Sequence, residues 1–105
     1  MASLLVIQGA DQGKRFEFTS GPVALGRENS NAVQLHDNEV SRRHAEFRRE
    51  GSGYTVHDVG SLNGTYVNRE RIDAAPLAGG DEVQIGKFRL VYLNAAVRAG
   101  VGAQP

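Results

Sequence analysis

Arginine and serine side chains occur in this sequence where a phosphate group could be held. Arg27 directly follows a glycine, and Ser41 directly precedes Arg42. A bound phosphate needs a guanidinium that makes paired hydrogen bonds and short donors around it. Each charge-assisted hydrogen bond contributes roughly 1.5–3 kcal/mol. Three or four of them, less the ordering costs, predict binding of about −8 kcal/mol, which is roughly micromolar.

Asn63 is a candidate for holding the peptide around such a phosphate. An asparagine amide carries a donor and an acceptor, so it can pair with both the N–H and the C=O groups of an extended backbone. Gly64 follows it, and an Asn-Gly pair is also the strongest short signal for a hairpin turn, because both residues tolerate a positive φ. We therefore expect a hairpin turn at Asn63-Gly64, with the Asn63 side chain free to bind a peptide.

Two other kinds of chemistry are less well supported. Ser41, His44 and Asp58 are the residue types of a hydrolase triad, but Ser41 lacks the Gly-x-Ser-x-Gly setting of a nucleophile elbow. On a single strand, Ser41 and His44 would point to opposite faces. The histidines, which include His36 and His57, share no metal-ligand spacing, and the sequence has no cysteine. We expect no catalysis, no metal and no cofactor.

Short strands are the elements that must position these residues. Strand-like runs bounded by turn residues occur at 4–7, 15–18, 22–25, 32–35, 44–49, 54–59, 81–86 and 88–93. No stretch has a sustained helical apolar period, and thirteen glycines interrupt the chain. The pattern predicts an all-β sandwich or barrel. The polar stretches 26–27, 41–44, 58–61 and 63–68 fall in its loops, where a rigid scaffold commonly gathers binding residues.

Length and charge narrow the class of protein. The 105 residues fit one domain. A net charge of zero, from twelve basic and twelve acidic residues, argues against a nucleic-acid binder. The N-terminus lacks the pattern of a signal peptide, and no apolar run approaches the roughly 20 residues of a membrane span. We expect a cytoplasmic monomer without nucleic-acid or membrane partners, with a domain over 1–94 and a flexible tail over the small residues 95–105.

The ordered motifs resemble the signature of the forkhead-associated (FHA) domain. The resemblance runs from about Leu4 to Leu93 and rests on Gly26-Arg27, Ser41-Arg42-Arg43-His44, Asn63-Gly64-Thr65 and Asn68. It implies a sandwich of about eleven strands that binds phosphothreonine peptides through loops at one end. Within the family, the sequence is most similar to small actinobacterial FHA regulators of 2-oxoglutarate metabolism. Those regulators carry an N-terminal segment with a phosphorylatable threonine that folds back onto their own site, whereas the printed sequence starts at its first strand.

The resemblance also implies a role for each motif residue. Arg27 and Ser41 would hold the phosphate, Arg42 would contact the phosphate or the adjacent backbone, and Asn63 would hold the peptide main chain. The supporting residues would be Gly26, His44, Ser61, Gly64, Thr65 and Asn68, with His44 bracing the loops by hydrogen bonds. The sequence departs from the family at Leu62, where many members have a serine or threonine that donates to the phosphate.

Two functions remain open at this point. The first is a non-catalytic phosphothreonine-peptide binding module in Ser/Thr-kinase-dependent signalling, with a Thr-phosphorylated protein or the kinase itself as partner. The second is a phospho-independent adaptor that uses the same sandwich, which the departure at Leu62 favours. Binding by the adaptor would not change when the partner is treated with a phosphatase.

Overall fold

The computed structural model describes residues 2–19 and 21–94. The predicted tail, 95–105, lies outside these residues. None of the described elements is a helix that could cross a membrane. The described residues form eleven strands: β1 (Ala2–Gln8), β2 (Arg15–Glu17), β3 (Val23–Gly26), β4 (Val33–Gln34), β5 (Ala45–Glu50), β6 (Gly53–Asp58), β7 (Thr65–Val67), β8 (Glu70–Ile72), β9 (Ala74–Pro76), β10 (Glu82–Ile85) and β11 (Phe88–Asn94).

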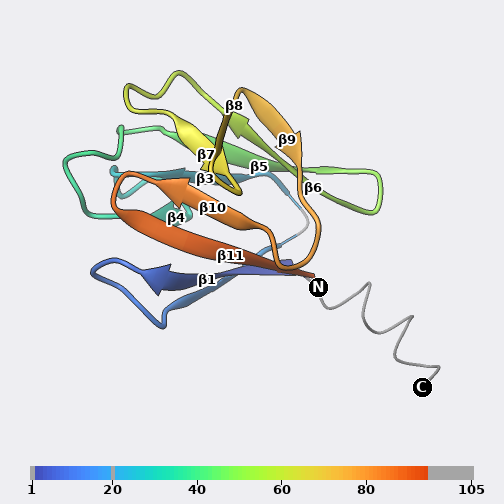
Figure 1. The fold of residues 1–105 in the computed structure, drawn as a ribbon. Coiled ribbons are helices and arrows are strands. Elements are labelled where there is room, and N and C mark those ends of the chain that lie inside the picture. The colour runs from blue at the N-terminus through green and yellow to red at the C-terminus, as the bar shows by residue number, and fades with distance from the viewer. Residues whose placement is uncertain (1, 20, 95–105) are drawn as a thin grey trace.

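The strands form two sheets that pack face to face (Figure 1). The six-stranded sheet has the order β2-β1-β11-β10-β7-β8, and the five-stranded sheet has the order β4-β3-β5-β6-β9. β3 and β4 pair in parallel, and the other pairings of the described strands are antiparallel. The prediction of an all-β sandwich of about eleven strands is confirmed.

Alternating apolar residues build the core between the two sheets. In β11, Phe88, Leu90 and Tyr92 are buried, whereas the residues between them are partly exposed, as the period of two of a strand requires. Phe47 of β5 faces them from the other sheet, and its ring centroid lies 5.3 Å from that of Phe18. Each buried aromatic or leucine side chain contributes about 1.5–3 kcal/mol, so this alternation fixes which face of each strand points inward.

Three strands were not expected from the sequence. β7, β8 and β9 are three residues long, and β8 and β9 are mostly exposed. Such short strands show too few alternations to be recognised. The predicted run 32–35 also shortens to Val33–Gln34. In contrast, the predicted hairpin at 81–93 is confirmed, with Ile85 paired to Phe88.

The prediction of a hairpin turn at Asn63-Gly64 is wrong. Of these two residues only Gly64 has a positive φ, 92°, and both precede β7. The turn of the β7–β8 hairpin is Asn68-Arg69, with φ values of 49° and 73°. Two successive residues with positive φ are what a two-residue type I′ turn requires. Asn63-Gly64 instead lies in the connection between β6 and β7, which leaves the Asn63 side chain on a loop.

The loops with the polar motifs lie at one end of the sandwich. Figure 1 shows the connections after β3, β4 and β6 together on the left. The start of β1 and the end of β11, which pair through Ala2 and Asn94, lie at the opposite end. The β3–β4 and β4–β5 loops are close in sequence, and the sandwich brings the β6–β7 loop, which follows two strands later, beside them.

Candidate functional site

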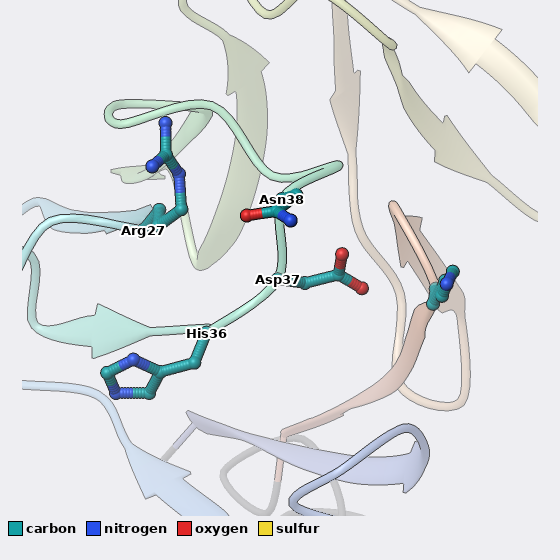
Figure 2. Close-up of a pocket in the computed structure, with 5 residues that line it drawn as sticks. Arg27, His36, Asp37 and Asn38 are labelled. Atoms are coloured by element: carbon teal, nitrogen blue, oxygen red, sulfur yellow. The ribbon is translucent and has the colours of Figure 1, made fainter.

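Arg27 stands at the point where the chain leaves β3. Its backbone N–H donates to the carbonyl of Ser41 at 3.0 Å, and its Nε donates to the carbonyl of Val40 at 3.0 Å. The side chain is exposed, and its two Nη atoms have no hydrogen-bond or ion-pair partner among residues 2–19 and 21–94. In Figure 2 the guanidinium extends away from His36. The group is thus held from one side while its outer nitrogens can bind an anion.

Ser41 is fixed by three contacts that leave its hydroxyl proton available. Its carbonyl accepts from Arg27, and its N–H donates to Nδ1 of His44 at 3.1 Å. Its Oγ accepts the N–H of Leu62 at 3.1 Å. Within the part of the chain that is described, no acceptor takes the hydroxyl proton. Ser41 can therefore donate to a ligand without giving up a contact.

His44 joins two of the loops from inside the protein. The ring is fully buried, its Nδ1 accepts from Ser41, and its Nε2 lies 2.9 Å from the carbonyl of Gly64. A carbonyl only accepts, so Nε2 carries the proton and the ring is neutral. Burial lowers the pKa of His44 below 6.5, although the Gly64 carbonyl and the Asp58 carboxylate act in the opposite direction. The neutral ring sets the spacing of the two loops.

Asp58, the last residue of β6, organises the β6–β7 connection. Its Oδ1 accepts the N–H groups of Gly60 and Ser61, each at 2.9 Å. Its Oδ2 accepts the hydroxyls of Ser61 at 2.5 Å and Thr65 at 2.8 Å. Burial raises the pKa of Asp58, but these hydrogen bonds outweigh it and the pKa is lowered. Ser61 Oγ also accepts the N–H of Gly64 at 2.9 Å, which closes the loop on itself.

Asn63 lies on this loop and is exposed. Its Nδ2 donates to the carbonyl of Glu39 at 3.0 Å, which ties the β6–β7 loop to the β4–β5 loop. Its Oδ1 accepts no hydrogen bond from the described residues. One N–H and the carbonyl oxygen of the amide therefore remain for a peptide backbone.

Gly26 and Asn31 fix the backbone at Arg42. A Cβ added to Gly26 would lie 2.1 Å from the Arg42 carbonyl oxygen, so only glycine fits. Asn31 is buried and donates from Nδ2 to the carbonyls of Glu28 at 2.9 Å and Arg42 at 2.8 Å. The Arg42 side chain is exposed beside these contacts. Asn31 could not be singled out by sequence reasoning, because the polar stretch that contains it has other asparagine and serine residues.

Asn68 lies apart from this cluster. At the β7–β8 turn, its Nδ2 donates to the Asp81 carboxylate at 3.1 Å and its Oδ1 accepts the N–H of Glu82 at 3.0 Å. These contacts join the turn to the start of β10. The structure therefore brings Arg27, Ser41 and Asn63 to one set of connected loops and places Asn68 on a neighbouring turn.

An open hollow of about 500 Å³ adjoins the cluster (Figure 2). Its lining residues are Arg27, His36, Asp37, Asn38 and Lys87. Of the predicted ligand residues only Arg27 lines this hollow, whereas Ser41 and Arg42 lie on the β4–β5 loop and Asn63 on the β6–β7 loop. This open arrangement suits an extended peptide better than a small molecule, which typically occupies an enclosed pocket.

The geometry does not match a hydrolase triad. His44 contacts the backbone N–H of Ser41 rather than its hydroxyl, and Asp58 binds Ser61 and Thr65 rather than the His44 ring. A triad histidine must accept the hydroxyl proton of the serine and donate to the carboxylate. These three residues instead stabilise loops.

An eleven-stranded sandwich with these linked loops at one end is the architecture expected of an FHA domain. The FHA domain family model matches residues 23–86, and the chain belongs to this family. The oxoglutarate dehydrogenase inhibitor of Corynebacterium jeikeium is 54% identical over 98 residues, which cover 93% of this chain and 68% of that protein. The glycogen accumulation regulator GarA of Mycolicibacterium smegmatis is 58% identical over 93 residues, which cover 89% of this chain and 59% of that protein.

A solved structure has the same fold. It comes from a structural and functional analysis of phosphothreonine-dependent FHA domain interactions and has a TM-score of 0.81 at 29% sequence identity. The superposition covers 89% of this chain and 95% of that one. The predicted family and the predicted similarity to actinobacterial regulators are confirmed.

Proposed function

We propose that this chain is a non-catalytic module that binds phosphothreonine peptides in Ser/Thr-kinase-dependent signalling. The observation that carries the proposal is the hydrogen bonding of the Arg27 and Ser41 side chains. Arg27 and Ser41 are each held by contacts to neighbouring loops, yet the Arg27 Nη atoms and the Ser41 hydroxyl proton have no partner in the described part of the chain. Donors held in advance lose little freedom when an anion binds.

Each ligand residue has a distinct role in this proposal. The Arg27 guanidinium makes paired hydrogen bonds to phosphate oxygens, and the Ser41 hydroxyl donates to a third. Arg42, exposed beside them, adds a second positive charge that speeds the capture of an anionic peptide. Asn63 uses its free oxygen and its remaining N–H to bind the peptide backbone.

The partner class follows from the same chemistry. The proposed partner is a Thr-phosphorylated protein or the Ser/Thr kinase itself. We propose that the chain binds it in the cytoplasm, as a monomer. The names of the two relatives, an inhibitor and a regulator, support a non-catalytic role. The solved structure described as phosphothreonine-dependent supports the choice of ligand. The zero net charge supports a protein partner over a nucleic acid.

Replacing Arg27 tests the proposal. Arg27→Ala removes at least one charge-assisted pair, so we expect binding of a phosphothreonine peptide to weaken by about 10- to 100-fold. Arg49→Ala is the matched control, because Arg49 is exposed on β5 away from the loops, and it should bind within about twofold of the wild type. Equal binding by Arg27→Ala and the wild type, measured by calorimetry, would refute the site.

A phosphatase experiment separates the module from the phospho-independent adaptor. A partner protein that binds the chain is divided, and one half is treated with a phosphatase. We expect the treated half to lose binding. Retained binding would favour the adaptor, whose contact surface would then lie on other parts of the sandwich.

A further inference from the structure

Leu62 is the most exposed large apolar side chain of the described residues. Its exposed fraction is 84%, against 39% for Val59 and 37% for Ile7. A single exposed leucine is common on protein surfaces. The position of this one is unusual, because it separates two residues of the β6–β7 loop that make specific contacts, Ser61 and Asn63.

The backbone at Leu62 is held on both sides and at its own N–H. The Leu62 N–H donates to Ser41 Oγ at 3.1 Å. On one side Ser61 binds Asp58 through both its N–H and its hydroxyl, and on the other Asn63 binds Glu39. The loop therefore presents a leucine side chain at a fixed place, one hydrogen bond away from the hydroxyl that we assign to the phosphate.

We infer that Leu62 is a specificity residue, which contacts an apolar side chain next to the phosphothreonine of the bound peptide. The inference rests on the proposed function. The peptide is the occupant that fits, because the loop carrying Leu62 also carries Asn63, the residue assigned to the peptide backbone. Leu62 is thus continuous with the surface that a bound peptide must cover.

The physical reason is that the polar residues cannot read the peptide sequence. Arg27 and Ser41 bind the phosphate, and Asn63 binds main-chain atoms, which are the same in every peptide. An apolar contact with Leu62 favours peptides with an aliphatic or aromatic side chain at one position. Burying part of a leucine and part of its partner strengthens binding by about tenfold.

The test uses a set of phosphothreonine peptides that are identical except at one flanking position, which holds either leucine or serine. Each flanking position is varied in turn, and each peptide is also made without phosphate. Dissociation constants are measured for the wild type, Leu62→Ser and Leu62→Met, with Ile7→Ser as the control at an exposed apolar residue on β1. Circular dichroism establishes that the variants are folded, as the exposure of Leu62 leads us to expect.

We expect the wild type to prefer leucine over serine by about tenfold at one position. Leu62→Met and Ile7→Ser should keep that preference. Leu62→Ser should lose it while still binding phosphorylated peptides more tightly than unphosphorylated ones. The inference is wrong if the wild type shows no such preference, or if Leu62→Ser keeps it, and in either case phosphate-dependent binding would leave the proposed function standing. Equal binding with and without phosphate would overturn both.

Discussion

Nε2 of His44 donates to the carbonyl oxygen of Gly64 across 2.9 Å, and this bond joins residues twenty positions apart. The other ring nitrogen accepts the N–H of Ser41. One loop carries Ser41, and the other carries Asn63. A buried side chain that touches no ligand therefore determines how far apart the proposed phosphate and backbone contacts lie.

Replacing His44 should weaken both stability and binding. His44→Ala leaves a cavity and removes the partners of two backbone groups, so we expect the free energy of unfolding to fall by about 2–4 kcal/mol. Affinity for a phosphothreonine peptide should fall as well, because the loops lose their spacing. Urea unfolding and calorimetry measure the two effects. The partly exposed His57 provides the control, and His57→Ala should change stability by less than about 1 kcal/mol. A similar small change in His44→Ala would contradict the bracing role.

The buried ring also predicts a dependence on pH. Burial holds the pKa of His44 below 6.5, so the unfolded chain binds a proton at a higher pH than the folded chain does. The unfolded state then carries more protons, and stability decreases as the pH falls below about 6.5 and through the folded pKa. The pKa of Asp58 is lowered too, so its contribution is lost as the pH falls below 3.8.

Urea unfolding at a series of pH values measures this effect. Between about pH 7 and pH 5 the wild type should lose stability more steeply than His44→Ala, because only the wild type has this ring. Peptide affinity should decrease once the folded ring is protonated, at a pH below 6.5, since a proton on Nδ1 would face the N–H of Ser41. Parallel curves for the two proteins would mean that His44 does not control the pH response.

A methyl group at Gly26 should disturb the site directly. The added Cβ would lie 2.1 Å from the Arg42 carbonyl oxygen, and a backbone atom cannot move aside cheaply. Gly26→Ala should cost about 1–3 kcal/mol of stability or more and should weaken peptide binding by displacing Ser41 and Arg42. At Gly21 an added Cβ meets nothing within 4 Å, so Gly21→Ala should stay within about 0.5 kcal/mol of the wild type. Thermal unfolding would show whether the two substitutions differ, and equal effects would argue against the close contact.

The β7–β8 turn offers a stabilising substitution. Arg69 has a φ of 73°, a conformation that costs a residue with a Cβ about 1–2 kcal/mol. Arg69→Gly should relieve this cost, although the greater freedom of glycine in the unfolded chain offsets part of the gain. We expect the free energy of unfolding to rise by about 0.5–1 kcal/mol. The melting temperature should rise by about 2–6 °C. Arg69→Ala keeps the strain and should give no rise. A gain in Arg69→Ala equal to that in Arg69→Gly would show that the arginine side chain, not φ, is responsible.

Much of the fold could be predicted because the long strands alternate clearly. In β11, buried Phe88, Leu90 and Tyr92 recur at every second position. The region from Thr65 to Pro76 has three short strands, and two of them pair with strands that are distant in sequence, β7 with β10 and β9 with β6. The Asn-Gly pair at 63–64 also carried the stronger turn signal, although the sheet places the turn at Asn68-Arg69. Tertiary pairing here overrode local preference.

The candidate site also contains residues that could be predicted from the sequence and residues that could not. The gathering of Arg27, Ser41 and Asn63 on connected loops could be predicted, because residues of these types matched a known signature. The hydrogen bonds of Asn31 and Asp58 were not, since they depend on which backbone groups the folded loops bring within reach. The proposed ligand residues and three of the side chains that brace them, His44, Ser61 and Thr65, were thus visible in the sequence, whereas Asn31 and the loop role of Asp58 were not.

Titration of the wild-type chain with a degenerate phosphothreonine peptide library, beside the matching phosphoserine and unphosphorylated libraries, tests the central claim most directly. We predict that the phosphothreonine library binds at roughly micromolar strength and that the other two bind far more weakly. Equal binding of all three, or binding of none, would contradict the assignment of Arg27 and Ser41 to a phosphothreonine site.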